Sequence, residues 1–360
     1  MERIAAILVI FVLLINGRHV DTRHPAIAVP IVITAQPVPL DSHDPARRTV
    51  GALRYLGGWV LGSDHPGFGG FSSLYRAPDG LLTLLSDTGE AATFRPGTGR
   101  RPGIFRPLPI FAAEAREPNW RWDTESLAVD PVTGRRWVGF ELTRRICRYA
   151  PDFTRVEQCR PHPEIQSWPE TTGMESLVRL PDGRFLALAE DAPGRGEAQE
   201  DGAKDVLLFP ADPVTPAGRR AVRLSYRPPP GYLPTDALWL GGGRMLVMNR
   251  RVTPFSLFTG VLTLVDVGRP HAGQRLEGRV VARLESPLLH DNYEAITLSW
   301  ERGEPVLWVA SDDNHLLFQR TLLLKFALPR AWVAGDGEEA SRRPARRPAH
   351  PSTAPHIPGE

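Results

Sequence analysis

Acidic residues mark the ends of a sequence unit that occurs five times. Four units carry a carboxylate where a first strand is expected to begin, at Glu125, Glu175, Asp236 and Glu294. Polar residues also stand where the second strand is expected to end, at Asp87, Glu141, Glu190, Asp191, Asn249, Asp312 and Asp313. The start of one strand and the end of the next share one edge of a hairpin, so we expect these side chains to converge at one mouth of a central channel.

Carboxylates gathered this closely repel one another, so some must be protonated, paired with arginine or bound to a cation. Oxygen ligands without His or Cys pairs nearby suit Ca²⁺ or Mg²⁺ better than Zn²⁺. We predict a Ca²⁺ (or Mg²⁺) site with the candidate ligands Asp87, Glu125, Glu175, Asp236, Glu294, Asp312 and Asp313. The alternative for each carboxylate is a structural role, in which it accepts hydrogen bonds from backbone groups of a neighbouring sheet.

Other charged residues near the expected mouth suggest catalysis. Arginines follow the ends of second strands, at Arg144, Arg145, Arg250 and Arg251. An arginine there can pair with the acids or hold a phosphate or carboxylate of a substrate. His290 and His315 are candidate acid–base groups, with an ordinary loop histidine as the alternative. The predicted catalytic residues are Glu175, Glu294, Asp312, Arg250 and His315.

The repeated unit predicts the fold. Each copy contains a strand, a turn with glycine and an apolar strand, at residues 71–87, 124–141, 174–191, 235–249 and 293–312. Two further extended stretches follow each hairpin, except in the last unit, where only one follows. Four strands every 50–60 residues or so are typical of a β-propeller blade.

We therefore predict an all-β chain forming a β-propeller of five four-stranded blades, or six if one blade is divergent. The segment from Tyr55 to Leu61 is predicted to supply the missing outer strand of the last unit and close the ring. A two-sheet sandwich is the structural alternative, but it does not predict such similar hairpins at this spacing.

The two ends of the chain differ from the middle. An apolar run from Ile4 to Ile15 predicts that residues 1–28 are a signal peptide, or alternatively an uncleaved membrane anchor. A signal peptide and an anchor both predict a protein in the periplasm or outside the cell, and the anchor would also tether it to a membrane. Residues 50–330 are the predicted propeller, and residues 334–360 are predicted to be a disordered tail rich in Pro and Arg. The chain is expected to be a monomer.

The two cysteines agree with an exported protein. Cys147 and Cys159 stand on two extended arms around a Pro-Asp turn. In a hairpin centred near Phe153 they would face each other, which predicts a disulfide. Two buried free thiols are the alternative.

Composition and missing motifs exclude several functions. The net charge is +2 at pH 7, and the only basic run, Arg342 to Arg347, lies in the predicted tail, so we expect no nucleic-acid partner. There is no Gly-x-Ser-x-Gly, His-Glu-x-x-His or Cys-x-x-Cys motif and no P-loop. A hydrolase of the Ser-His-Asp type is therefore disfavoured.

Three motifs resemble the bacterial phytase-like domain family, also described as having esterase-like activity of phytase. They are Asp123-Thr-Glu-Ser-Leu-Ala, Gly173-Met-Glu-Ser-Leu and Asp291-Asn-Tyr-Glu-Ala-Ile, together with Ser311-Asp-Asp-Asn and Gln319. The resemblance covers Val50 to Pro329, and the Ser-Asp-Asp-Asn stretch is its most specific part. One departure is His315, where a phenylalanine is more typical. The resemblance implies a propeller fold and hydrolysis of phosphoesters or esters.

Three hypotheses for function follow. The first is an exported hydrolase that acts on a small anionic ester or phosphoester through a carboxylate-held divalent cation, with Arg250 holding the substrate anion. The second is a Ca²⁺-dependent lactonase. The third is a propeller without catalysis that binds a ligand or a protein at its mouth.

Overall fold

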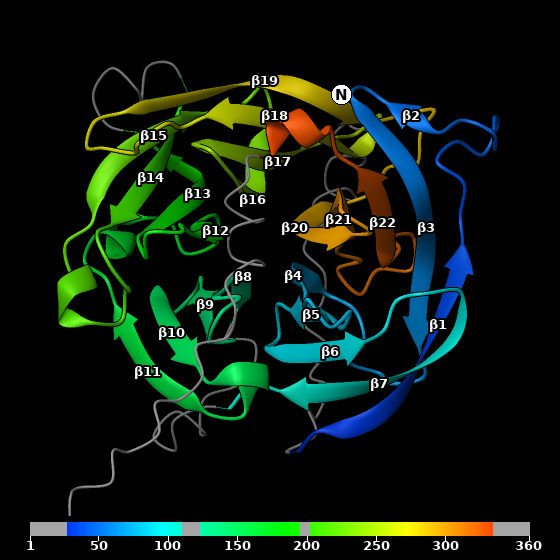
Figure 1. Cartoon of the computed structure of the whole chain (residues 1–360), viewed down its shortest axis with the longest axis horizontal. Coiled ribbons are helices and arrows are strands. Elements are labelled where there is room, and N and C mark those ends of the chain that lie inside the picture. The colour runs from blue at the N-terminus through cyan, green and yellow to red at the C-terminus, as the bar shows by residue number, and fades with distance from the viewer. Residues whose placement is uncertain (1–26, 110–122, 195–201, 334–360) are drawn as a thin grey trace, which may run out of the picture.

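A computed structural model describes residues 27–109, 123–194 and 202–333. These residues form strands and a few short 3₁₀ turns, which confirms the all-β class. The strands lie around a common centre, and β4, β8, β12, β16 and β20 are the ones nearest to it (Figure 1).

The strands form successive antiparallel groups, each running from the centre outward. The first group is β4 (Phe71–Arg76), β5 (Leu82–Ser86), β6 (Glu90–Phe94) and β7 (Gly99–Pro107). The second is β8 (Thr124–Val129), β9 (Arg136–Phe140), β10 (Arg145–Tyr149) and β11 (Val156–Pro161). The third is β12 (Met174–Arg179), β13 (Phe185–Pro193), β14 (Lys204–Phe209) and β15 (Val222–Arg227).

The last two groups follow the same plan. One is β16 (Leu233–Gly241), β17 (Arg244–Thr253), β18 (Leu257–Asp266) and β19 (Arg275–Leu284). The other is β20 (Tyr293–Glu301), β21 (Glu304–Ser311), β22 (Leu322–Ala327) and β3 (Leu53–Ser63), with β3 antiparallel to β22. The expected outer strand, residues 55–61, thus lies in β3. The short turns are Pro151–Phe153, Ile165–Ser167, Pro216–Gly218 and Arg330–Trp332.

Two connections join these groups into larger sheets. Strand β1 (Val29–Pro37) lies between β3 and β7 and is antiparallel to both. Strands β15 and β19 form a short parallel pair between the third and fourth groups. Strand β2 (Thr49–Val50) adds a small hairpin to β3. The described strands therefore form three sheets, of 10, 4 and 8 strands, whereas the sequence repeat predicts five separate blades.

Local sequence explains the hairpins. In the first and third groups the turn is Pro-Asp-Gly, and its glycine has positive φ, 91° at Gly80 and 88° at Gly183. The aspartate side chain accepts the backbone N–H two residues later, at 2.9 Å from Leu81 and 3.1 Å from Arg184. The second strands β5 and β9 are buried along their whole length. This explains why the two strands have adjacent apolar residues, Leu84-Leu85 and Trp137-Val138, instead of a strict apolar–polar alternation.

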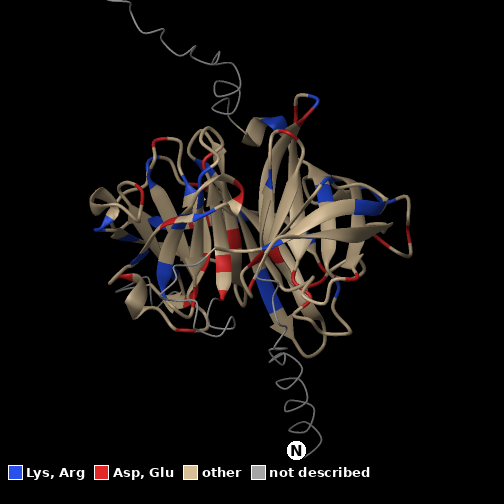
Figure 2. Ribbon diagram, turned by 90° about the horizontal axis from the view of Figure 1, so that it is seen from below, with Lys and Arg blue, Asp and Glu red and all other residues tan. Residues whose placement is uncertain are grey.

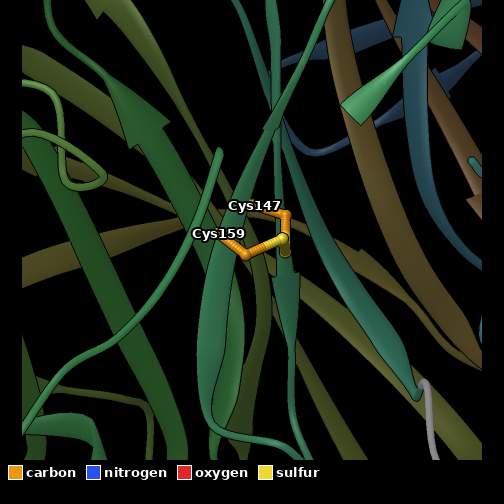
Figure 3. Close-up of a disulfide and its surroundings, with 2 residues drawn as sticks. All are labelled: Cys147 and Cys159. Carbon is orange, nitrogen blue, oxygen red and sulfur yellow. A yellow bond between two sulfur atoms is a disulfide. The ribbon is translucent and has the colours of Figure 1, made fainter. Parts of the chain in front are cut away.

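The predicted disulfide is present. Cys147 on β10 and Cys159 on β11 are directly opposite in the ladder and are bonded (Figure 3). The bridge joins the two outer strands of the second group.

The predicted signal or anchor (1–28) and the predicted tail (334–360) lie outside the described residues, except for Ile27 and Ala28. Within the described part of the chain, no helix has the length and apolar character needed to span a membrane.

Candidate metal centre

Each of the five strands nearest the centre has a β-bulge near its start, and in β16 the bulge falls one residue earlier than in the others. In β4, for example, Phe71 pairs with Ser86 and Ser73 pairs with Leu85, so that Ser72 has no partner. The residues skipped in the five strands are Ser72, Glu125, Glu175, Thr235 and Glu294. We call the edge of the molecule that carries them the site face. A bulge turns its extra side chain out of the regular alternation, so one backbone feature aims all five side chains.

The three bulge glutamates meet. Carboxylate oxygens of Glu125, Glu175 and Glu294 lie within 4.8 Å of one another, although the residues come from three different strands. Glu175 and Glu294 are buried, and Glu125 is half-buried. Seen from the side, acidic segments lie on strands in the middle of the molecule (Figure 2). A donor set made only of carboxylate oxygens fits a hard divalent cation.

A second acidic group shares Glu125. Its other members are Asp123 and Glu141, again with oxygens within 4.8 Å of one another. The backbone N–H of Glu141 donates to Asp123 O at 2.8 Å, and the Glu141 carboxylate accepts the N–H of Gly173. Sequence reasoning did not select either residue as a ligand. Glu141 stands at an expected strand end, but Asp123 precedes its strand, and only its place in the Asp-Thr-Glu-Ser motif marks it.

Asp87, Asp312 and Asp313 lie on the same face, where β5 and β21 end. Asp313 Oδ1 accepts Gly70 N at 3.0 Å, and its Oδ2 accepts the Thr321 hydroxyl at 2.6 Å. Asp312 Oδ1 accepts Asn314 N at 2.7 Å. The Oδ1 atom of Asp87 is buried and has no hydrogen-bond partner among the described residues. A buried carboxylate oxygen without a donor is itself a reason to expect a cation nearby.

His315 lies beside Asp87 because a glycine lets them approach. A Cβ atom added to Gly70 would stand 2.6 Å from Asp87 Oδ1 and 3.1 Å from His315 Nε2. Gly70 also has φ of 60°, which disfavours other residues there. His315 is exposed to solvent and has φ of 50°. The imidazole therefore borders the acidic cluster from its solvent side.

Arg250 is the basic residue within the cluster. Its guanidinium forms ion pairs with Glu190 and Glu294 and donates to Asn292 Oδ1 at 2.9 Å. Arg144 instead pairs with Glu170 at 3.0 Å, and Arg251 stacks over the Tyr232 ring. Of these three arginines, Arg250 is the one that contacts the central acids.

Burial controls the pKa values of the cluster. Desolvation, followed by repulsion from neighbouring acids, raises the pKa of Glu125, Glu175 and Asp312 well above the usual range. The same two causes raise the pKa of Asp87 to about 7 and that of Glu141 to about 9. For Arg250, burial opposes the charge, but Glu294 and Glu190 outweigh it and hold its pKa above the usual value. Among the described residues, Arg250 is the one basic side chain that contacts these acids, and a single positive charge does not compensate all of them when ionised.

Asp236 occupies the position that the sequence repeat suggests, but its strand places the bulge one residue earlier. Ala237 pairs with Val247 as Ala295 pairs with Ala310, so Asp236 and Glu294 are equivalent in the ladder, while β16 skips Thr235 instead. Its Oδ1 accepts the N–H of Ala237 and its Oδ2 accepts that of Ile296, both at 2.7 Å. The Oδ2 contact joins β16 to β20, and because both oxygens accept backbone N–H groups we leave Asp236 out of the ligand set.

These features define the class: an all-β, propeller-like protein with a buried acidic site where its central strands begin. The family model for phytase-like proteins, described as esterase-like activity of phytase, matches residues 66–315. The chain therefore belongs to the phytase-like family.

Solved structures resemble the chain only weakly. A PQQ-bound aldose sugar dehydrogenase from Streptomyces coelicolor is 12% identical, with a TM-score of 0.40 over 78% of this chain and 99% of that chain. The WD40 propeller domain of Doa1 is 10% identical, with a TM-score of 0.36 over 78% of this chain and 100% of that one. Similarity this weak carries no argument about function. No match was found among curated proteins.

Proposed function

We propose that the protein is an exported hydrolase that cleaves esters or phosphoesters with a divalent cation, Ca²⁺ or Mg²⁺, bound on its site face. One observation carries this proposal: three glutamates from three separate strands bring carboxylate oxygens within 4.8 Å of one another. Membership of the phytase-like family supports the reaction class.

The residues present fit such a cation. Glu125, Glu175 and Glu294 would hold it, and Asp87 and Asp312 lie close enough for their charges to interact with Glu294. A bound divalent cation supplies Lewis-acid chemistry toward a phosphoryl or carbonyl oxygen. The raised pKa values of Glu125 and Glu175 show that the protein alone leaves these negative charges poorly compensated.

The chain's own residues then have distinct roles. Arg250 orients Glu190 and Glu294, because its guanidinium already contacts both. Holding a substrate anion, the role expected from sequence, would require one of these two contacts to open. His315, exposed beside Asp87, is placed to exchange a proton between the site and solvent.

We also propose that the fold is a five-bladed propeller. Each of the five strand groups contains four strands, and each group begins with the same bulge at the centre. In this interpretation β3 completes the last blade through its pairing with β22, and β1 joins that blade to the first one.

Export and a monomeric state belong to the same proposal. The apolar run Ile4 to Ile15 supports a signal or anchor, and the Cys147–Cys159 bridge suits an oxidising compartment.

The test is hydrolysis by the purified protein, measured with and without a chelator on phosphomonoesters, carboxylic esters and sugar lactones. We expect turnover of a phosphomonoester or ester that chelation abolishes and that Ca²⁺ or Mg²⁺ restores. The matched control for Glu175→Gln is Glu304→Gln, because Glu304 is exposed at the other end of a strand. Unchanged turnover under chelation and in Glu175→Gln would contradict the proposal, and turnover of lactones alone would identify a lactonase instead.

A ligand-binding propeller without catalysis is the second candidate. The observation that favours it is an aromatic side chain on the site face, Phe255, which is fully exposed. This candidate predicts that a ligand raises the melting temperature without being consumed.

A further inference from the structure

The site face carries large apolar side chains that solvent surrounds. Phe255 and Leu317 are fully exposed, and Phe318 and Leu257 are nearly half-exposed. Single exposed apolar residues are ordinary on protein surfaces, but several on one face indicate a contact surface.

Strand directions place all four residues on this face. Strand β17 passes the level of the bulge where Asn249 pairs with Pro234 and continues to Thr253, so the turn with Phe255 projects beyond the site. Leu317 and Phe318 lie in the loop between β21 and β22, which also carries Asp312, Asp313 and His315. The two segments belong to neighbouring strand groups.

The chain also enters the fold on this face. Strand β7 ends at Pro107, which pairs with Glu90 next to the turn that follows Asp87. Strand β1 is antiparallel to β7 and begins at Val29, opposite Phe105, so its first residues lie at the same edge. Ile27, just before it, is exposed. The sequence before β1 contains the apolar run Ile4 to Ile15.

The other face differs. Val132 is exposed there, in the turn between β8 and β9, and Val222 and Trp300 are 40% and 38% exposed at the far ends of β15 and β20, but the N-terminal sequence does not enter on that side. Strand β22 starts at Leu322 on the site face and ends at Ala327 on the far side, so the last described residues lead away from the site. Apolar loops and the entry of an apolar N-terminal sequence therefore coincide on one face only.

We propose that the site face docks on a lipid bilayer, with Phe255, Leu317 and Phe318 in the interface beside the N-terminal apolar run. Apolar side chains gain free energy on entering the boundary between headgroups and acyl chains. Two attachments, the run and the loops, hold a protein on a membrane more firmly than either alone. The acidic site would then open toward the membrane, and this orientation does not depend on which ester the site takes.

Single introduced cysteines test the docking in the full chain. Both native cysteines are in the disulfide, so a cysteine at a surface position is the only free thiol. Phe255→Cys, Leu317→Cys and the far-face control Val132→Cys are each labelled with a polarity-sensitive dye. They are then mixed with vesicles of phosphatidylcholine and phosphatidylglycerol. We expect the emission to shift to the blue and to be quenched by brominated lipid at positions 255 and 317, and to stay unchanged at position 132.

Three results would overturn the proposal. One is vesicle binding without a response at 255 and 317, which would leave the N-terminal run as the only attachment. Another is an equal response at all three positions, which would show no preferred face. The third is a blue shift that appears at high protein concentration without vesicles, which would assign the apolar loops to contact between two copies of the chain.

Discussion

The five central strands share one bulge but use it in two ways. In β4 and β16 the bulge residue has a hydroxyl side chain, which donates a hydrogen bond to the next central strand. Ser72 donates to Thr124 O at 2.5 Å, and Thr235 donates to Tyr293 O at 3.1 Å. In β8, β12 and β20 the bulge residue is a glutamate, and the three carboxylates meet each other.

The two kinds of bulge residue have opposite effects on the stability of the fold. A neutral hydroxyl with a carbonyl partner is satisfied where it lies and adds a modest stabilisation. Of the three carboxylates, Glu294 pairs with Arg250, but Glu125 and Glu175 beside it destabilise the fold unless a proton or a cation neutralises them. The hydroxyl bulges therefore stabilise the contact between neighbouring strands. The glutamate bulges instead lower the stability of the fold, which indicates that they serve the function of the protein.

The largest expected effect is on cation binding in Glu175→Gln. Removing one of three charged ligands is expected to weaken Ca²⁺ affinity by about 1,000-fold, because affinity in oxygen-ligand sites follows the number of carboxylates. Without cation the same variant is expected to unfold at a higher temperature than the parent, since it removes the cost of burying a carboxyl group that must either stay charged among other acids or take up a proton. Calorimetric titration and thermal melts measure both, and Glu304→Gln should match the parent in each. Parent-like Ca²⁺ affinity would place the cation elsewhere.

Arg250→Gln addresses the positive charge within the cluster. Its side chain is only 20% exposed and pairs with two glutamates, so its loss leaves both carboxylates unpaired. We expect the free energy of unfolding without cation to fall by about 2–3 kcal/mol, measured by urea denaturation at pH 7. Added Ca²⁺ should recover part of the loss. A change below the error of the method would show that the pairing contributes no stability.

Stability of the cation-free protein should fall as the pH rises. Asp87 has its pKa raised to about 7 and Glu141 to about 9, so the folded state binds their protons more tightly than the unfolded state does. This contribution is fully present below the unfolded pKa values near 4 and is lost as the pH rises through 7 to 9. We expect the melting temperature in chelator to drop by several degrees between pH 5 and pH 9. Ca²⁺ should reduce the drop, and a flat profile in chelator would contradict the assignment.

The smallest effect is expected in the hydroxyl bulges. Ser72→Ala and Thr235→Val each remove one buried hydrogen bond and should lower the free energy of unfolding by about 1 kcal/mol. Ca²⁺ affinity should stay at the parent value, which calorimetry can check. A large loss of affinity in either variant would mean that the two kinds of bulge are not separate in function.

Much of the fold follows from sequence because the hairpins are local. The repeated turn and apolar strand fix each hairpin, and the pairing of Cys147 with Cys159 follows from the turn between them. Strand β1 and the β15–β19 pair lie outside the repeat, since both depend on contacts between distant segments. The signal peptide or anchor at residues 1–28 and the disordered tail at residues 334–360 stay predictions.

The site was predicted in outline and not in detail. Strand ends bring Glu125, Glu175 and Glu294 to one face, as the repeat indicates. In β16 the bulge falls one residue earlier, at Thr235, and this shift is invisible in sequence, so the repeat could not show that Asp236 pairs in the ladder while the glutamates aligned with it do not. Asp123 was not predicted as a ligand, because the prediction considered only the first and last residues of strands and Asp123 precedes its strand.

The central claim is that the three glutamate bulges form a cation site. A crystal structure grown with Ca²⁺ tests it most directly. The account predicts a strong density peak at 2.3–2.6 Å or so from oxygens of Glu125, Glu175 and Glu294. A well-ordered map in saturating Ca²⁺ with no peak among these carboxylates, or with the three side chains turned apart, would contradict it.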